Sequence, residues 1–131
     1  LRARFDEANN IEWSKVLENA GCQVEYGDEN FKCHSKICLI TLKNKGKISH
    51  ITQIGTGNYN EKTSELYTDY SFITADHGIG EEASNVFQNL AVQKLTEESD
   101  RMLVAPLRFK SVLLEQMDRQ IAAPAAGFRH P

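Results

Sequence analysis

The chain has 131 residues and a net charge of −3, with 40% hydrophobic and 25% charged residues. These values are typical of a compact soluble domain, and the slight acidity argues against a nucleic-acid-binding face. No apolar run approaches the ~20 residues of a membrane span. Three cysteines without CxxC spacing favour a reducing compartment over a disulfide framework or a zinc site. Because the chain starts Leu-Arg-Ala-Arg without a signal peptide, we expect a cytoplasmic piece of a longer protein.

The first half of the chain predicts one helix followed by three strands. Apolar residues at helical spacing, including Trp13 as a core residue, predict a helix over Glu7–Ala20 that Gly21 would end. The elements that follow are a strand over Cys22–Tyr26, a strand over about Lys32–Lys43, a hairpin turn at Asn44–Gly46 and a strand over Lys47–Ile54. The hairpin would return the chain towards the start of the second strand.

The second half predicts a strand at Tyr70–Thr74 and an amphipathic helix over Gly80–Ala91. The expected core face of this helix consists of Ala83, Val86, Phe87 and Leu90. The polar stretch Lys94–Arg101 is typical of a linker. A short strand is expected at Met102–Ala105, and Pro106 would open a last helix that reaches about Ile121.

His34 and Lys36 are the first candidate site residues. Alternate side chains of a strand share a face, so the two would point the same way, roughly 6–7 Å apart along the strand. A nitrogen nucleophile beside a fixed cation suits attack on phosphorus. Cys33 would face the opposite way, which argues against a Cys–His nucleophile pair. The other histidines, His50, His77 and His130, share no motif and are assigned no role. We therefore predict His34 as nucleophile and Lys36 as the cation for phosphate oxygens, against the ordinary interpretation of both as structural strand residues.

The stretch Gly55–Thr63, with the sequence GTGNYNEKT, is the second candidate. Gly57 would let the backbone approach a phosphate closely, and the Asn58 amide would donate to the same oxygens. Each could instead serve only the turn. Either Asp69 or Glu61 is the candidate acceptor for the second ring nitrogen of His34. The two stretches together favour phosphoryl chemistry.

Four motifs carry a resemblance to a known family. They are Arg2–Glu7 (RARFDE), His34–Lys36 (HSK), Ile54–Thr63 (IGTGNYNEKT) and Leu66–Asp69 (LYTD). Together they resemble a polyphosphate kinase of the long, multidomain type, from Leu1 to about Ile121. The resemblance implies the first of two C-terminal domains with the phospholipase D fold: an α/β domain with a mixed sheet flanked by helices. It places this domain at residues 1–98. Residues 99–131 would be a linker and the opening strand and helix of a truncated second domain.

The same resemblance implies an activity and three site residues. The family reversibly transfers the γ-phosphate of ATP to polyphosphate through a phosphohistidine, with Mg²⁺. His34 matches the phosphorylated histidine, and Arg4 matches an arginine that contacts phosphate and magnesium. Tyr67 matches a tyrosine that lines the nucleotide pocket. The expected partners are ATP, ADP and inorganic polyphosphate, and the full-length enzyme is expected to be a cytoplasmic homo-oligomer able to associate with a membrane.

Two positions depart from the complete pattern. Phospholipase D enzymes carry an Asp five residues after the motif Lys, where this chain has Thr41, and some relatives have a second histidine where it has Gln53. The 131 residues alone are expected to be inactive. Two alternatives remain open: a phospholipase D-type phosphodiesterase, and a non-enzymatic polyphosphate-binding module.

Overall fold

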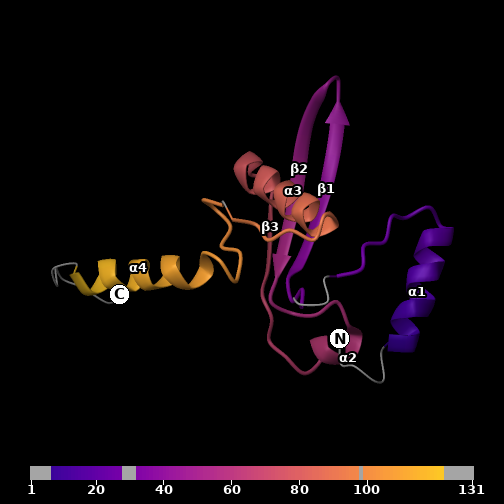
Figure 1. Ribbon diagram of the computed structural model, residues 1–131, viewed down its shortest axis with the longest axis horizontal. Coiled ribbons are helices and arrows are strands. Elements are labelled where there is room, and N and C mark those ends of the chain that lie inside the picture. Colours follow the sequence, from indigo (N-terminus) through magenta and orange to yellow (C-terminus); the bar gives the residue numbers. More distant parts are fainter. Residues whose placement is uncertain (1–6, 28–31, 98, 123–131) are drawn as a thin grey trace.

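Figure 1 shows the chain as a computed structural model, in which residues 7–27, 32–97 and 99–122 are described. A β-hairpin stands at the centre, one helix crosses it, and two helices extend away on either side in this view. The elements are α1 (Glu7–Asn19), β1 (Lys36–Asn44), β2 (Lys47–Gly55), α2 (Glu61–Ser64), β3 (Ser71–Thr74), α3 (His77–Ala91) and α4 (Phe109–Ala122). None of the helices in the described residues is long and apolar enough to cross a membrane.

The sheet has the order β1-β2-β3, and both neighbouring pairs are antiparallel. The hairpin register runs from Lys36 opposite Gly55 to Asn44 opposite Lys47. Lys45 and Gly46 both have positive φ, at 47° and 81°, which is the twist that a two-residue hairpin turn requires. The predicted turn and the α/β class are confirmed. Every strand pair in the described ranges is antiparallel, so the parallel pair of a mixed sheet is not found among them.

Helix α3 packs on one face of the hairpin, mainly against β2. It begins at His77, three residues before the predicted start, because the Asp76 carboxylate caps it by accepting from Ile79 N at 2.9 Å. Gly80, Ala83 and Val86 form its buried face, opposite His50 and Thr52 of β2. Since these helix residues are small, the helix lies very close to the sheet.

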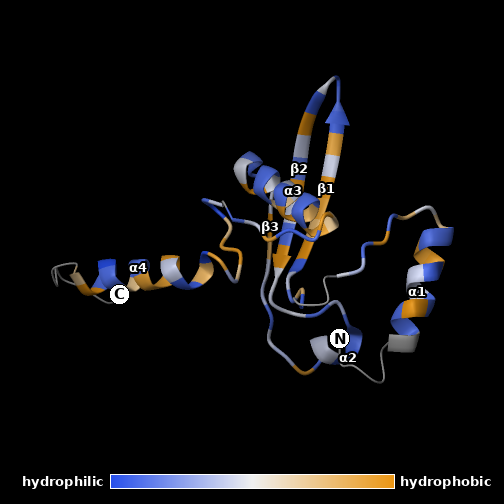
Figure 2. Ribbon diagram, viewed as in Figure 1, coloured by the Kyte–Doolittle hydropathy of each residue, from blue (hydrophilic) through white to orange (hydrophobic). Residues whose placement is uncertain are grey.

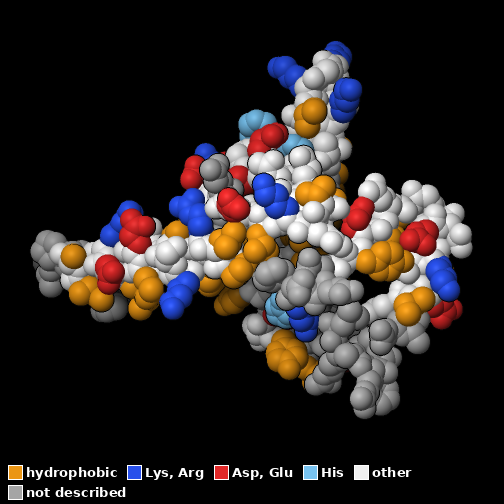
Figure 3. Space-filling model, in the orientation of Figure 1, with side chains coloured by type: hydrophobic (Ala, Val, Ile, Leu, Met, Phe, Trp, Pro, Cys, Tyr) orange, Lys and Arg blue, Asp and Glu red, His pale blue; other side chains and the backbone are white. Residues whose placement is uncertain are grey.

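Much apolar surface stays open. Phe87 and Leu90, predicted as core, are 39% and 40% exposed, and Trp13 is 58% exposed. The sheet face away from α3 shows Ile40 and Ile73 to solvent. Figure 2 shows hydrophobic residues along the strands, and Figure 3 shows orange hydrophobic side chains at the surface along α4.

The total exposed area supports this observation. The chain exposes 11591 Å², whereas a compact monomer of 14.8 kDa would expose roughly 7000 Å². Trp13 is exposed because α1 packs on no other helix or strand of the described residues to any extent, and Phe87 and Leu90 lie beside the buried face of α3 rather than on it. An excess of this size is typical of elements that pack against further protein.

Three predicted strand segments differ from the structure. Cys22–Tyr26 is no strand: Gly21 ends α1 with a φ of 88°, and the Tyr26 hydroxyl then contacts Ser14 of that helix at 3.1 Å. The strand expected from Lys32 begins at Lys36, because β2 ends at its partner Gly55 and offers no pairing before it. Met102–Ala105 is also no strand, since Met102 N donates to the Glu82 side chain instead of a neighbouring strand.

Candidate active site

The structure brings His34 and Lys36 together. Lys36 opens β1, and His34 lies two residues before the strand rather than inside it. Lys36 Nζ is 3.1 Å from His34 Nε2 and donates to the His34 carbonyl oxygen at 2.7 Å. Lys36 is only 9% exposed, while the His34 side chain is exposed. An ammonium held this firmly beside an accessible imidazole can neutralise charge on a group bound to the ring.

Lys36 borders the glycine-rich loop because it pairs with Gly55 across the hairpin. A Cβ on Gly55 would lie 3.7 Å from Lys36 Cβ and 2.9 Å from Gln53 Nε2. The loop after Gly55 opens into a shallow pocket of about 200 Å³. Its lining residues are Gln53, Gly55, Gly57, Asn58, Tyr59, Ser64, Asp69, Tyr70 and Ser71. The end of β1 that carries the cation therefore lies at the edge of this pocket.

Asp69 shapes the loop at Gly57. A Cβ at Gly57 would lie 2.3 Å from Asp69 Oδ2, so any larger residue would displace the carboxylate. Thr56 Oγ1 donates to Asp69 Oδ1 at 2.8 Å and accepts from Tyr70 N at 3.0 Å. Thr56 N also donates to the Tyr70 carbonyl at 3.0 Å. These bonds tie the loop to the segment that leads into β3.

Gln53 connects two other residues that line the pocket, Ser71 and Tyr59. Its amide donates to Ser71 Oγ at 2.9 Å and accepts from the Tyr59 hydroxyl. Farther along, the Asn60 side chain caps α2 by accepting from Thr63 N at 3.1 Å. Gln53 therefore positions an aromatic residue of the loop, at the position where some relatives have a second histidine.

The predicted site residues do not all converge. Gly57 and Asn58 line the pocket, and His34 contacts Lys36 at its edge. Tyr67 is 67% exposed and is not among the pocket residues. Arg4 lies outside the described residues. Within those residues, the polar partner of the His34 ring is Lys36, whereas Asp69 is held by Thr56.

Sequence reasoning overlooked Gln53 as part of the pocket and named Asp69 only as a candidate acceptor for the His34 ring. Alternation along β2 could have revealed Gln53, since it shares a sheet face with Gly55, opposite Lys36. The contact of Asp69 with Gly57 gave no such signal, because it depends on the path of the loop between α2 and β3.

His50, which was assigned no role, is a packing residue of the opposite sheet face. It is 5% exposed, its Nδ1 is 3.1 Å from Thr41 Oγ1, and its Nε2 is 3.2 Å from Glu81 Oε1. Thr41, at the position where phospholipase D enzymes carry an Asp, therefore contacts the histidine that joins the sheet to α3.

The described residues contain no group of three or more His, Cys, Asp or Glu side chains placed to hold a metal ion. Asp69 is the one acid that lines the pocket. A single carboxylate at the pocket fits a Mg²⁺ ion that keeps most of its waters and takes few ligands from the protein.

Comparison with known proteins identifies the family. A family model described as "Polyphosphate kinase C-terminal domain 1" matches residues 1–96. The polyphosphate kinase of Staphylococcus haemolyticus is 42% identical over 94% of the chain, and that of Escherichia coli K12 is 42% identical over 97%. The chain spans only 17% and 18% of the length of these two relatives.

A solved structure agrees with the sequence comparisons. The crystal structure of the polyphosphate kinase from Porphyromonas gingivalis superimposes with a TM-score of 0.76 at 30% identity. The match covers 92% of this chain and 20% of that one. By motif, fold and sequence, the chain belongs to the polyphosphate kinase family, and its residues 1–96 match the family's C-terminal domain 1.

Proposed function

We propose that this chain forms the phosphohistidine-bearing part of an enzyme that reversibly transfers the γ-phosphate of ATP to polyphosphate. The contact of Lys36 Nζ with the His34 ring, at the edge of the glycine-lined pocket, carries the proposal. An ammonium has donors and no acceptor, so Nε2 accepts from it and the neutral ring carries its hydrogen on Nδ1. Nε2 is therefore the ring nitrogen that holds the lone pair for attack.

The reaction runs in two displacements. A γ-phosphate oxygen draws Lys36 Nζ away from His34, and the freed Nε2 attacks phosphorus. An N–P bond forms, the bond between the γ-phosphorus and the β–γ bridging oxygen breaks, and ADP leaves with the electron pair. A terminal oxygen of polyphosphate then attacks the phosphohistidine, which lengthens the polymer by one unit and restores the imidazole. Such transfer depends mostly on positioning and charge neutralisation, which Lys36 supplies to the phosphoryl oxygens.

The loop supplies the remaining contacts. Gly57 and Asn58 line the pocket, and we assign their backbone N–H groups and the Asn58 amide to phosphate oxygens. Asp69, the acid that lines the pocket, would help to hold a Mg²⁺ ion bound with the nucleotide, and the ion would supply charge neutralisation to the phosphates. Arg4 and Tyr67 are assigned to phosphate and nucleotide by the family resemblance.

The test labels the nucleophile in the complete protein that contains these residues. The protein is incubated with γ-labelled ATP and Mg²⁺, and the acid-labile label is mapped by peptide. We expect the label on His34, and its loss in His34→Gln. His77→Gln is the matched control, because His77 is 74% exposed at the start of α3 and lies outside the pocket. Label retained after His34→Gln would exclude this mechanism.

The isolated 131 residues are a separate case. We propose that they do not turn over ATP. Much apolar surface of the chain is exposed, and the chain spans only 17% of the length of the Staphylococcus haemolyticus relative, so further protein is expected around the site. Full turnover by the 131-residue chain, measured as ADP release, would contradict this. Hydrolysis of a model phosphodiester by the complete protein, without phosphohistidine, would instead favour the phosphodiesterase alternative.

A further inference from the structure

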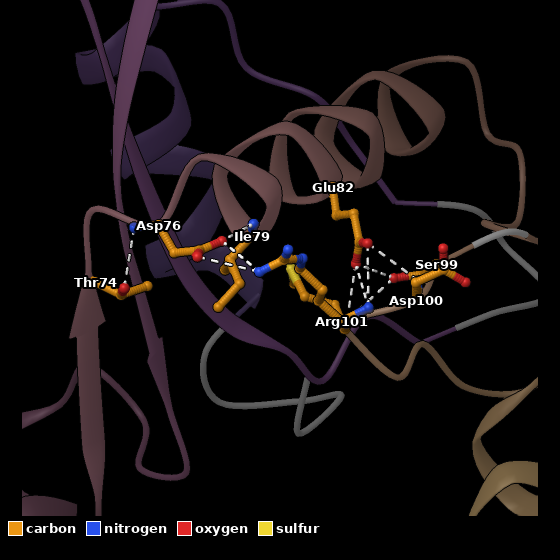
Figure 4. A network of polar contacts seen from close by, with 8 residues as sticks. Thr74, Asp76, Ile79, Glu82, Ser99, Asp100 and Arg101 are labelled. Carbon is orange, nitrogen blue, oxygen red and sulfur yellow. Dashed lines mark hydrogen bonds and ion pairs between the residues drawn. The ribbon is translucent and has the colours of Figure 1, made fainter.

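The Glu82 carboxylate of α3 binds a bend at residues 99–102 (Figure 4). It accepts from the Ser99 hydroxyl at 2.5 Å and from the backbone N–H groups of Asp100 at 3.1 Å, Arg101 at 3.0 Å and Met102 at 2.8 Å. Burial raises the pKa of Glu82, but these four donors together outweigh it and hold the pKa below its ordinary value. The 99–102 bend is therefore fixed to the helix by an ionised side chain.

A second contact fixes the same bend to the start of α3. Arg101 Nη1 lies 3.0 and 3.1 Å from the two oxygens of Asp76, the residue that caps the helix. The hydrogen bond from Ile79 N lowers the pKa of Asp76 most, burial opposes it, and the charge of Arg101 lowers it further. A Cβ at Gly78 would lie 2.6 Å from Arg101 Nε, so glycine there makes room for the guanidinium.

The bend lies where the chain leaves the family domain. The family match ends at residue 96, and the predicted domain boundary was 98/99. Beyond the bend, Arg108 Nη1 donates to the Ser99 carbonyl at 3.3 Å, directly before α4 begins at Phe109. Contacts therefore run from Arg108, directly before α4, through the bend to α3. Helix α3 packs on the two strands that carry Lys36 and Gly55.

We infer that Glu82 is a positioning residue, which fixes the segment leading out of this domain in a defined orientation to the His34–Lys36 site. The effect of Glu82 on the rate of phosphoryl transfer rests on the proposed function, whereas its contact with the bend does not. A polar stretch that the sequence presents as a free linker thus becomes a rigid connection. Whatever follows α4 in the complete protein is attached to α3 through the carboxylates of Glu82 and Asp76 and the guanidinium of Arg101.

A purely stabilising role would have different consequences. If Glu82 only stabilised the fold, its loss would lower the melting temperature but leave kcat unchanged wherever the protein remains folded. If it positions the following segment, kcat falls in the folded enzyme, since a displacement of about 1 Å can cost a factor of about 100 in rate.

The experiment uses the complete protein in four forms: wild type, Glu82→Gln, Ser99→Ala and Glu97→Gln. Gln at 82 removes the charge and turns an NH₂ group towards the backbone donors. Ala at 99 removes one donor without changing any charge, and so tests the contact should Glu82→Gln fail to fold. Glu97 is the matched control, an exposed acid next to the same segment. Hydrogen exchange of the 99–102 and 36–55 peptides is measured together with kcat, KM and labelling of His34.

We expect Glu82→Gln to speed exchange in 99–102 at least tenfold and to lower kcat about tenfold or more, while residues 36–55 stay protected. Ser99→Ala should change both in the same direction by a smaller factor, and Glu97→Gln should change neither. Unchanged exchange in 99–102 would overturn the contact itself. Faster exchange with unchanged kcat and KM would overturn positioning. If wild type fails to label His34, the proposed function falls, and exchange alone still decides the contact.

Discussion

The close packing of α3 on the sheet gives the sharpest prediction, at Gly80. A Cβ built there would lie 2.4 Å from His50 Cβ, where ordinary contacts begin near 3.4 Å. Because a Cβ is fixed to its backbone, no rotamer of His50 relieves the contact. The Gly80→Ala variant must therefore move α3 away from β2 by about 1 Å, which opens the packing of Ala83 and Val86.

The magnitude follows from two opposing effects. Overpacking costs about 1–3 kcal/mol, and a contact between two Cβ atoms as close as this one belongs in the upper half of that range, at about 2–3 kcal/mol. Replacing glycine by alanine inside a helix returns about 1 kcal/mol. We expect a net loss of about 1–2 kcal/mol, which lowers the protection of the α3 amides roughly 5- to 30-fold. If only the helix propensity of residue 80 mattered, Gly80→Ala would instead stabilise α3 and raise the protection of its amides.

Native-state hydrogen exchange of the complete protein measures this loss for α3 separately from other segments. Gly27→Ala is the control, since nothing lies within 4 Å of a Cβ there. Two double variants then locate the contact: His50→Gly should relieve part of the Gly80→Ala loss, whereas His50→Ala keeps the offending Cβ and should not. Unchanged or increased α3 protection in Gly80→Ala would refute the packing described for this helix.

Three further predictions concern the site, the end of α3 and the 99–102 bend. Lys36→Met should lower kcat/KM about 100-fold or more in a phosphoryl-transfer assay, because it removes the charge beside the nucleophile. Gln93→Gly should stabilise the end of α3 by about 0.5–1 kcal/mol by hydrogen exchange, since Gln93 has a φ of 54° that glycine adopts without strain. Glu82 has a pKa below its ordinary 4.5, so its stabilisation is present above that value and is lost as pH falls through the folded pKa. Exchange in 99–102, normalised to intrinsic rates, should rise below about pH 4.5 in wild type and not in Glu82→Gln.

Each of these predictions has a direct control. Lys43→Met removes an exposed lysine near the far end of β1 and should leave kcat/KM unchanged; an equal loss would mean that Lys36 acts only through net charge. Gln88 lies inside α3, so Gln88→Gly should destabilise the helix. If Gln88→Gly and Gln93→Gly changed the stability of α3 in the same direction, the positive φ of Gln93 would not explain the gain. A wild-type bend that stays protected at pH 3 would contradict the charged state of Glu82.

Local chemistry explains which elements were predictable. The hairpin turn follows from Gly46, and the end of α1 follows from Gly21, because glycine adopts a positive φ without strain. The proximity of His34 and Lys36 was also predicted, from their spacing alone. Trp13 was predicted wrongly as a core residue, since its burial depends on what packs against α1, and helical spacing does not report that.

The sequence by itself determined the motifs that identify the family, the hairpin and the residue types capable of phosphoryl chemistry. Only the tertiary structure decided where β1 begins, because a strand exists only as far as a partner pairs with it, and β2 ends at Gly55. The structure alone also placed Asp69 against Gly57 and Glu82 against the 99–102 bend. These contacts join residues 12 and about 18 positions apart, a separation over which periodicity and propensity carry no information.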